Sequence, residues 1–325
     1  MSEFLTGIGL NILLTVLGFV VLIKSADFFV DGAASIARNF KISTSVIGLT
    51  IVAFGTSAPE LAISFTSHLS GNTDILFGNV IGSNIVNILV ILGVAILIKP
   101  FKISERVVKS EIPIVMLVTI GMSVLLLDNL FDASRVNTLT RTDGIILLLF
   151  FSVFVFYLIT VALNKKSDEI DDGVPKYKVT KALIATLLGL AGIILGSDLI
   201  VDNVAALAIS IGVSQKIVAV TIISIGTSLP ELVTIIIAAK KGENSLAIGS
   251  VIGSNIFNTC IVLGLPIVFL GDAATEAFNI IDVSFMIFAL ALLWVFSITE
   301  KGFRRYEGVI FILVYAMYAT YIFLQ

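Results

Sequence analysis

The sequence carries one seven-residue motif twice, and each copy places a glutamate inside a long apolar stretch. Residues 55–61 read Gly-Thr-Ser-Ala-Pro-Glu-Leu, and residues 226–232 repeat the motif 171 positions later as Gly-Thr-Ser-Leu-Pro-Glu-Leu. A charged side chain near the centre of a bilayer costs at least about 2.5 kcal/mol even on the most permissive insertion scale. Each glutamate therefore needs a partner or a ligand, and the two copies together predict one shared site.

The apolar context of the motif extends over the whole chain. Hydrophobic residues make up 58% of the sequence and charged residues 13%, whereas soluble domains carry about 25% charged residues. The mean hydropathy is +1.10. We therefore expect an all-α polytopic membrane protein whose main surroundings are the lipid bilayer. The net charge of -3 is small and unclustered, which argues against nucleic acid as a partner.

Hydropathy over a window of about 20 residues predicts ten membrane-spanning helices. They cover residues 8–36, 43–67, 75–98, 108–127, 143–163, 180–208, 215–239, 245–270, 280–299 and 306–324. The only sizeable hydrophilic stretch between them is residues 164–178. The chain is thus expected to comprise a first five-helix repeat at 1–163, a linker at 164–178 and a second five-helix repeat at 179–325.

The distribution of lysine and arginine predicts the orientation of these helices. The odd-numbered loops hold 16 of the 20 basic residues, whereas the even-numbered loops hold only Arg135, Arg141 and Lys216. By the positive-inside rule, the odd loops and the linker face the cytoplasm and both termini are extracytoplasmic. A multi-pass protein of a prokaryotic cell (plasma) membrane is the simplest expectation.

The duplication extends well beyond the motif. Residues 50–93 align with 221–264 without a gap, and 19 of these 44 positions are identical. The same offset places Asp27 and Asp31 opposite Asp198 and Asp202. Because each half holds an odd number of spans, the second copy enters the membrane from the opposite side, which predicts inverted-topology repeats and alternating access.

Glycine and proline within the motif predict that the second and seventh helices are broken. Proline removes an amide donor and clashes with the carbonyl four residues earlier, so backbone carbonyls near the break become available as ligands. Hydroxyl groups lie within one turn of each glutamate. The candidate ligands from this motif are the carbonyls of Ala53 and Ser224, the hydroxyls of Thr56, Ser57, Thr227 and Ser228, and the carboxylates of Glu60 and Glu231.

A second duplicated motif adds amide and hydroxyl oxygens. Residues 82–87 read Gly-Ser-Asn-Ile-Val-Asn, and residues 253–258 read Gly-Ser-Asn-Ile-Phe-Asn. Helical spacing puts Ser83 with Asn87, and Ser254 with Asn258, on one face. An oxygen-only set of this kind suits Ca2+ and Na+ and argues against zinc or copper. The remaining asparagines, Asn84 and Asn255, are expected to form interhelical hydrogen bonds.

The paired motifs on a five-plus-five repeat resemble the prokaryotic sodium/calcium exchanger family of the cation/calcium antiporter superfamily. The resemblance implies a secondary antiporter that exchanges Na+ for Ca2+, with one Ca2+ between the two glutamates competing with several Na+ ions. The ion ligands that it implies are Ala53, Thr56, Ser57, Glu60, Ser83, Asn87, Ser224, Thr227, Ser228, Glu231, Ser254 and Asn258. Many relatives have an aspartate where this sequence has the neutral Asn87 or Asn258.

Two further expectations come from the resemblance: the long first and sixth helices slide as a gate, and the protein works as a monomer without a cofactor. Proton or K+ coupling at the same glutamates remains the alternative, because a buried carboxylate next to a like charge can also carry protons.

The sequence lacks the His-Glu-x-x-His and Gly-x-Ser-x-Gly motifs of hydrolases, so it does not indicate an enzyme. A passive channel is disfavoured by the inverted repeats with discontinuous helices.

Overall fold

The computed structural model describes residues 2–132, 134–163, 174–213, 224–275, 278, 280–300 and 302–324. Most of the predicted linker, 164–173, and the beginning of the predicted seventh span, which includes Lys216, lie outside the described residues.

The described part of the first half is almost entirely helical. Its elements are α1 (Ser2–Phe40), α2 (Thr44–Ile47), η1 (Gly48–Val52), α3 (Ala53–Thr56), α4 (Ala58–Leu69), α5 (Thr73–Val86), η2 (Asn87–Leu92), α6 (Gly93–Ile98), η3 (Val107–Glu111), α7 (Ile112–Leu126), α8 (Asp128–Phe131), β1 (Asn137–Leu139) and α9 (Arg141–Leu163), where η marks a π-helical segment.

The second half repeats this order closely. Its described elements are α10 (Val179–Ser210), α12 (Ser224–Thr227), α13 (Leu229–Lys241), α14 (Asn244–Phe257), η5 (Asn258–Val262), α15 (Gly264–Leu270), β2 (Ala273–Thr275), α16 (Ile280–Glu300) and α17 (Arg305–Leu324). In both halves a π-helical segment begins at the second asparagine of the duplicated motif, at Asn87 and at Asn258.

The prediction of a helical chain with several apolar spans is confirmed. Among the described residues, seven helical segments are long and apolar enough to cross a bilayer, and eight if the bent pair Thr44–Thr56 and Ala58–Leu69 counts as one span. The finer prediction of ten spans in two inverted repeats stays a prediction. The short antiparallel pairing of β1 with β2 was not predicted, because three-residue strands leave no alternation signal.

Both motif copies break their helices in the same way. The pair formed by α2–α3 and α4 bends by 45°. Ser57, between α3 and α4, has φ -88° and ψ 9°, and Ser228, between α12 and α13, has φ -87° and ψ 0°. A proline follows each serine within the first turn of the next helix, where its missing amide donor costs little. The duplicated sequence thus produces a duplicated backbone geometry.

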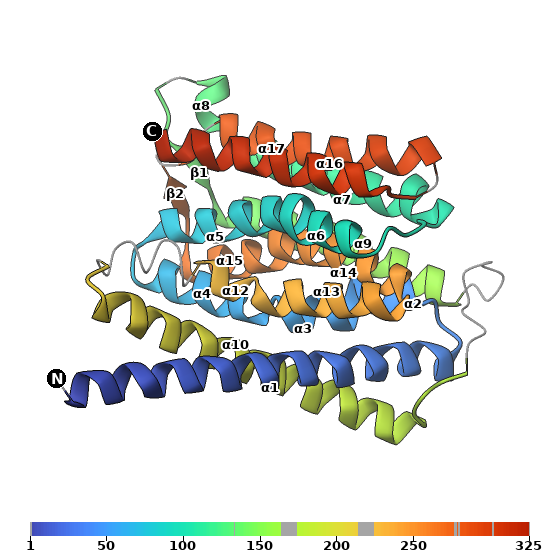
Figure 1. The fold of residues 1–325 in the computed structure, drawn as a ribbon. Coiled ribbons are helices and arrows are strands. Elements are labelled where there is room, and N and C mark those ends of the chain that lie inside the picture. The colour runs from blue at the N-terminus through green and yellow to red at the C-terminus, as the bar shows by residue number, and fades with distance from the viewer. Residues whose placement is uncertain are drawn as a thin grey trace.

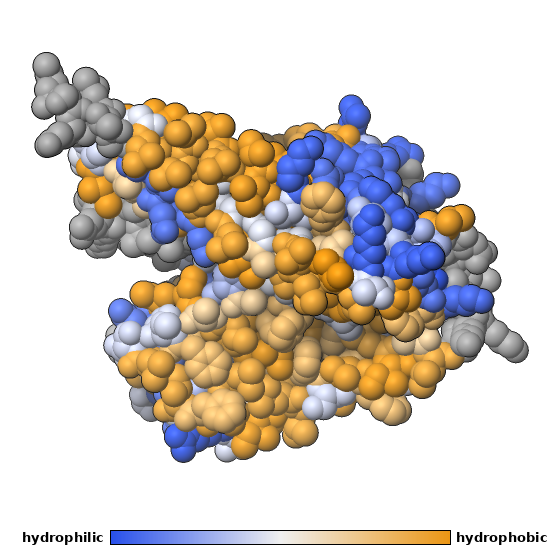
Figure 2. Space-filling view, turned by 90° about the horizontal axis from the view of Figure 1, so that it is seen from below, coloured by the Kyte–Doolittle hydropathy of each residue, from blue (hydrophilic) through white to orange (hydrophobic). Residues whose placement is uncertain are grey.

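Helices α1 and α10 lie side by side along one side of the molecule, apart from the stacked remainder (Figure 1). Glycine permits their close approach: a Cβ at Gly189 would come within 2.7 Å of the Phe29 backbone, and one at Gly196 within 2.7 Å of the Leu22 backbone. The surface on this side is largely hydrophobic, with hydrophilic residues gathered toward one end (Figure 2). Such a surface matches a lipid environment.

Helix α14 forms the centre of the remaining helices. All its residues from Leu246 to Phe257 are buried. It crosses the segment before the first break at close range, because a Cβ at Gly249 would come within 2.6 Å of the Ser45 carbonyl oxygen and one at Gly253 within 2.7 Å of the Leu49 backbone. Glycine at these two positions permits the close approach, and this contact brings the two halves together.

Candidate functional site

The two glutamates lie at the beginnings of the half-helices that follow the breaks. Glu60 is in the first turn of α4 and Glu231 is in the first turn of α13, and each is only 1% exposed. The amino-terminal end of a helix carries a partial positive charge, which stabilises a carboxylate in its first turn. The backbone therefore offsets part of the cost of burying these two charges.

A hydrogen bond joins the two halves at this site. The Ser57 hydroxyl, from the first break, donates to Oε1 of Glu231 at 3.1 Å. The hydroxyls of Ser57 and Ser254 are also hydrogen-bonded, with 3.1 Å between their oxygens. Ser57 is three positions before Glu60, so this bond places Glu231 beside the break that leads into the turn carrying Glu60. Sequence positions about 170 residues apart are thus brought into one polar cluster.

Four buried acceptor oxygens of the candidate ligands have no hydrogen-bond partner among the described residues. They are Oε2 of Glu60, Oε2 of Glu231, Oδ1 of Asn87 and Oδ1 of Asn258. They form two pairs related by the duplication. An unpaired buried acceptor is costly, and the cost is greatest for a carboxylate. Acceptors of this kind are ready-made ligands for a hard cation.

A chain of amide hydrogen bonds orients Asn87. Asn87 Nδ2 donates to Asn255 Oδ1 at 3.1 Å, and Asn255 Nδ2 donates to the Asn84 carbonyl at 3.2 Å. Asn84 Nδ2 in turn donates to Thr259 Oγ1 at 2.9 Å. Asn84 and Asn255 therefore form interhelical hydrogen bonds, as expected. Because the amide nitrogen of Asn87 is used in this chain, its oxygen is left as the free end.

Asn79 is a positioning residue that the sequence analysis missed. Its Nδ2 donates to the Glu60 carbonyl oxygen at 2.9 Å and to Ser64 Oγ at 3.0 Å. It fixes the first turn of α4 against α5. Asn79 is four residues before Ser83, so it lies on the same face of α5 as that candidate ligand, and this spacing was the available signal.

The carbonyl of Ala53 differs from the expectation. It accepts the Ser57 amide at 3.0 Å and lies 3.4 Å from Thr56 Oγ1, so the break does not free it. The reason is register: Pro59 removes the donor to residue 55, four positions before it, and not the donor to residue 53. A carbonyl oxygen has two lone pairs, so Ala53 can still accept a cation as an additional partner.

The other candidate ligands surround the breaks. Thr56, Ser83, Ser228 and Ser254 are buried. Thr227 is partly buried, and Ser224 lies in α12, directly before the second break. The Thr56 hydroxyl donates to the Val52 carbonyl at 3.1 Å, which leaves its oxygen lone pairs as acceptors.

Carboxylates are few in this cluster. Across the described ranges, no group of three or more His, Cys, Asp or Glu side chains is arranged to hold a metal ion. The candidate set is instead two carboxylates with neutral hydroxyl, amide and carbonyl oxygens. Such a set favours cations that accept oxygen ligands in flexible geometry, such as Ca2+ and Na+.

Comparison with known proteins identifies relatives over nearly the whole chain. The family model described as sodium/calcium exchanger protein matches residues 10–160 and 181–324. The putative antiporter CaxA of Alkalimonas amylolytica is 39% identical over 318 residues, which covers 94% of this chain and 96% of the relative. The sodium/calcium exchanger MaX1 of Methanosarcina acetivorans is 30% identical, with 97% and 99% covered.

A solved structure agrees in fold over almost the same range. The sodium-calcium exchanger NCX_Mj, soaked with 10 mM Na+ and zero Ca2+, superposes with a TM-score of 0.82 at 30% identity. The match covers 96% of this chain and 99% of that one.

Proposed function

Because this chain belongs to the sodium/calcium exchanger protein family, whose members are transporters and not enzymes, we propose that it exchanges Na+ for Ca2+ across a membrane by alternating access. The ions bind midway between Glu60 and Glu231. Na+ and Ca2+ are the transported substrates, and the protein requires no cofactor.

The observation that supports this site best is the pair of buried carboxylate oxygens, Oε2 of Glu60 and Oε2 of Glu231, that have no hydrogen-bond partner among the described residues. Two neighbouring carboxylates in a low-dielectric interior repel each other strongly. Four basic residues fall within the predicted spans: Lys109, Lys181 and Lys216 are each the second residue of a span, and Lys24, farther from a span end, is exposed on α1. A mobile cation is therefore the partner that both glutamates need.

The exchange of Na+ for Ca2+ follows from the oxygen ligands that the two ions share. Ca2+ takes six to eight oxygens, and one Ca2+ between the glutamates uses both carboxylates. Several Na+ ions occupy overlapping positions and also use neutral oxygens. The proposed ligands are Ala53, Thr56, Ser57, Glu60, Ser83 and Asn87 from the first half, and Ser224, Thr227, Ser228, Glu231, Ser254 and Asn258 from the second. Because Ca2+ and Na+ compete for the carboxylates, the site carries one or the other.

The proposed architecture is ten spans in two inverted five-helix repeats, 1–163 and 179–325, joined by a cytoplasmic linker. Both termini are extracytoplasmic and the protein works as a monomer. Helices α1 and α10 move together as the gate, which their mutual packing supports. An empty site with two uncompensated carboxylates crosses poorly, so each crossing carries an ion and the Na+ gradient drives Ca2+ the opposite way.

Uptake of radioactive Ca2+ into proteoliposomes tests this proposal. An outwardly directed Na+ gradient is expected to drive Ca2+ accumulation, while K+ gradients or pH gradients alone drive none. Accumulation driven by a pH or K+ gradient without Na+ would instead support the proton- or K+-coupled alternative. Currents far above carrier rates in single-channel recordings would overturn antiport altogether.

A further inference from the structure

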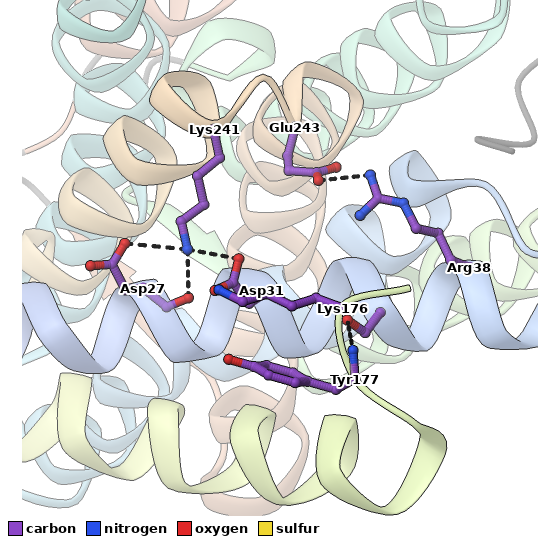
Figure 3. A network of polar contacts seen from close by, with 8 residues as sticks. Asp27, Asp31, Arg38, Lys176, Tyr177, Lys241 and Glu243 are labelled. Atoms are coloured by element: carbon purple, nitrogen blue, oxygen red, sulfur yellow. Dashed lines mark hydrogen bonds and ion pairs between the residues drawn. The ribbon is translucent and has the colours of Figure 1, made fainter. Parts of the chain in front are cut away.

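A lysine at the end of α13 ties two aspartates of α1 to the remaining helices. Lys241 Nζ lies 3.2 Å from Asp27 Oδ1 and 2.8 Å from Asp31 Oδ1, and it donates to the Asp27 carbonyl at 2.8 Å (Figure 3). One ammonium group thus holds two successive turns of α1. These turns of the proposed gate helix lie beside Lys241, the last residue of α13.

Further contacts surround this ion-pair cluster. Lys176, just before α10, lies 2.6 Å from the second carboxylate oxygen of Asp31, and this hydrogen bond raises the pKa of Lys176 (Figure 3). Arg38 pairs with Glu243, between α13 and α14, at 2.8 Å. At this end, which we call the Lys241 end, α1 is therefore bound both to the segment leading into α10 and to the α13–α14 turn.

The duplication does not reproduce the cluster at the opposite end. Asp198 and Asp202 on α10 are the counterparts of Asp27 and Asp31, but the counterpart of Lys241 is Ser70. The Ser70 hydroxyl donates to the Thr66 carbonyl at 2.7 Å. Asp198 and Asp202 are exposed, and within the described ranges no basic side chain forms an ion pair with either.

Helix packing follows the same asymmetry. At the Lys241 end, α1 packs along α13. The corresponding pair at the Ser70 end is α10 with α4, which have at most marginal contact among the described residues. Among the described residues, the gate pair thus packs against the other helices where the lysine is present and has little such packing where serine replaces it.

We propose that Lys241, Asp27 and Asp31 form a one-sided latch that favours the conformation closed at the Lys241 end and open at the Ser70 end. The inference rests on the proposed function, in which α1 and α10 move against the other helices. Sliding of α1 must separate Lys241 from both carboxylates. In the described part of the chain the duplicated aspartates of α10 have no such ion pair to break, so two otherwise equivalent states differ in stability.

The exposure of the latch sets its strength. The side chains of Lys241 and Asp31 are 26% and 15% exposed, so water still screens the pair. Ion pairs at such positions bias an equilibrium without locking it. Loss of the latch is expected to increase the ratio of the population open at the Lys241 end to the population closed there by about three- to tenfold.

Cysteine labelling in membrane vesicles measures this ratio. Thr234, one turn after Glu231 toward Lys241, is buried and becomes the probe as Thr234→Cys in a chain whose single cysteine is replaced by Cys260→Ala. In this background, Lys241→Gln and Asp31→Asn should each raise the labelling rate by an impermeant maleimide from the Lys241 end about three- to tenfold. The matched control is Lys240→Gln, which removes the same charge from the neighbouring exposed position and should leave the rate unchanged.

Two further variants separate loss of the latch from general damage to the protein. Lys241→Arg keeps the positive charge beside Asp27 and Asp31, so its labelling rate should stay close to that of the parent. Moving the lysine, by Lys241→Ser with Ser70→Lys, should raise labelling at Thr234→Cys and lower it at Ile63→Cys, the duplicated position at the other end. Equal rates in the parent, Lys241→Gln and Lys240→Gln chains, or a rate for Lys241→Arg as high as that for Lys241→Gln, would overturn the latch. Labelling needs no ion gradient, so failure of Na+-driven Ca2+ uptake would leave this result interpretable.

Discussion

The two halves of the molecule surround equivalent glutamates differently. Glu231 accepts a hydrogen bond from Ser57 of the other half, whereas no side chain among the described residues donates to the carboxylate of Glu60. The carbonyl of Glu60 accepts from Asn79, whereas the duplicated position holds Ser250, whose buried hydroxyl has no partner in the described part of the chain. A side chain therefore holds the backbone of Glu60 in the first half, whereas a side chain holds the carboxylate of Glu231 in the second half.

This difference shows that the two halves keep the same types of proposed ion ligand but not the same residues around them. The acidic, amide and hydroxyl oxygens proposed to hold the ions are the same in type at duplicated positions. The side chains that position these oxygens differ between the halves. The position of Asn79 corresponds to Ser250, and that of Lys241 corresponds to Ser70. An alternating-access protein needs matched ligands in both states, but it can set the balance between the states through unequal supports.

The largest effect is expected from the glutamates themselves. Glu60→Gln and Glu231→Gln should each lower Na+-dependent Ca2+ flux by at least about 100-fold, because a buried ion site loses half its formal charge. Flux into proteoliposomes measures this loss. Glu105→Gln, which alters an exposed carboxylate paired with Lys109, is the control and should exchange normally. Near-normal exchange by either variant would remove that glutamate from the site.

Ser57 and Ser228, which occupy duplicated positions, are expected to differ in their effect on Ca2+ affinity. Ser57→Ala should weaken the apparent Ca2+ affinity by about tenfold or more, because it removes a hydrogen bond to a buried charge. Ser228→Ala should cost only about threefold, because no such bond from Ser228 is present among the described residues. The concentration dependence of Ca2+ uptake gives both values. Equal or reversed losses would break the proposed asymmetry between the halves.

The asparagine chain predicts an effect on stability. Asn255→Ala removes the partner of the Asn87 amide and of the Asn84 carbonyl, both buried. The thermal midpoint should fall by about 2–6 °C. Asn84→Ala loses its donor bonds to Thr259 and Met286 but keeps the carbonyl that Asn255 uses, so its midpoint should fall less. Fluorescence-detected melting in detergent compares the two, and a larger loss for Asn84→Ala would contradict the role assigned to Asn255.

The smallest effect is expected at Asn79, whose duplicated position holds Ser250. Asn79→Ser converts the first half to the residue type of the second, and it should lower the thermal midpoint by about 1–3 °C through two lost hydrogen bonds. Ca2+ affinity should stay within about twofold, since Asn79 bonds the backbone of Glu60 and not its carboxylate. A large loss of affinity without a change in melting would instead make Asn79 a direct ligand.

Much of the fold could be predicted because each half repeats strong local signals. Long apolar stretches and the Gly and Pro positions predicted the helices and the interruptions at Ser57 and Ser228, and the structure has both breaks. Duplication predicted that the two motifs meet, and the Ser57–Glu231 hydrogen bond joins them. These properties depend on residue type and spacing, which the sequence contains directly.

The contacts that position the proposed site and the gate helix could not be predicted, because they depend on how elements distant in the sequence pack together. Lys241 reaches Asp27 and Asp31 across more than 200 residues, whereas the sequence showed these aspartates only as duplicated positions. Ala53 was expected to offer a freed carbonyl, but its hydrogen bond to the Ser57 amide persists through the break. Helix register and side-chain reach decide such details, and composition does not encode them.

The position of a bound Ca2+ tests the central claim most directly. A crystal structure of the protein with Ca2+ and without Na+ is expected to show one strong anomalous peak at about 2.3–2.6 Å from carboxylate oxygens of both Glu60 and Glu231. Addition of Na+ should weaken that peak. A peak bound to only one of the two glutamates, or one that lies elsewhere while Ca2+ is transported, would contradict a shared site.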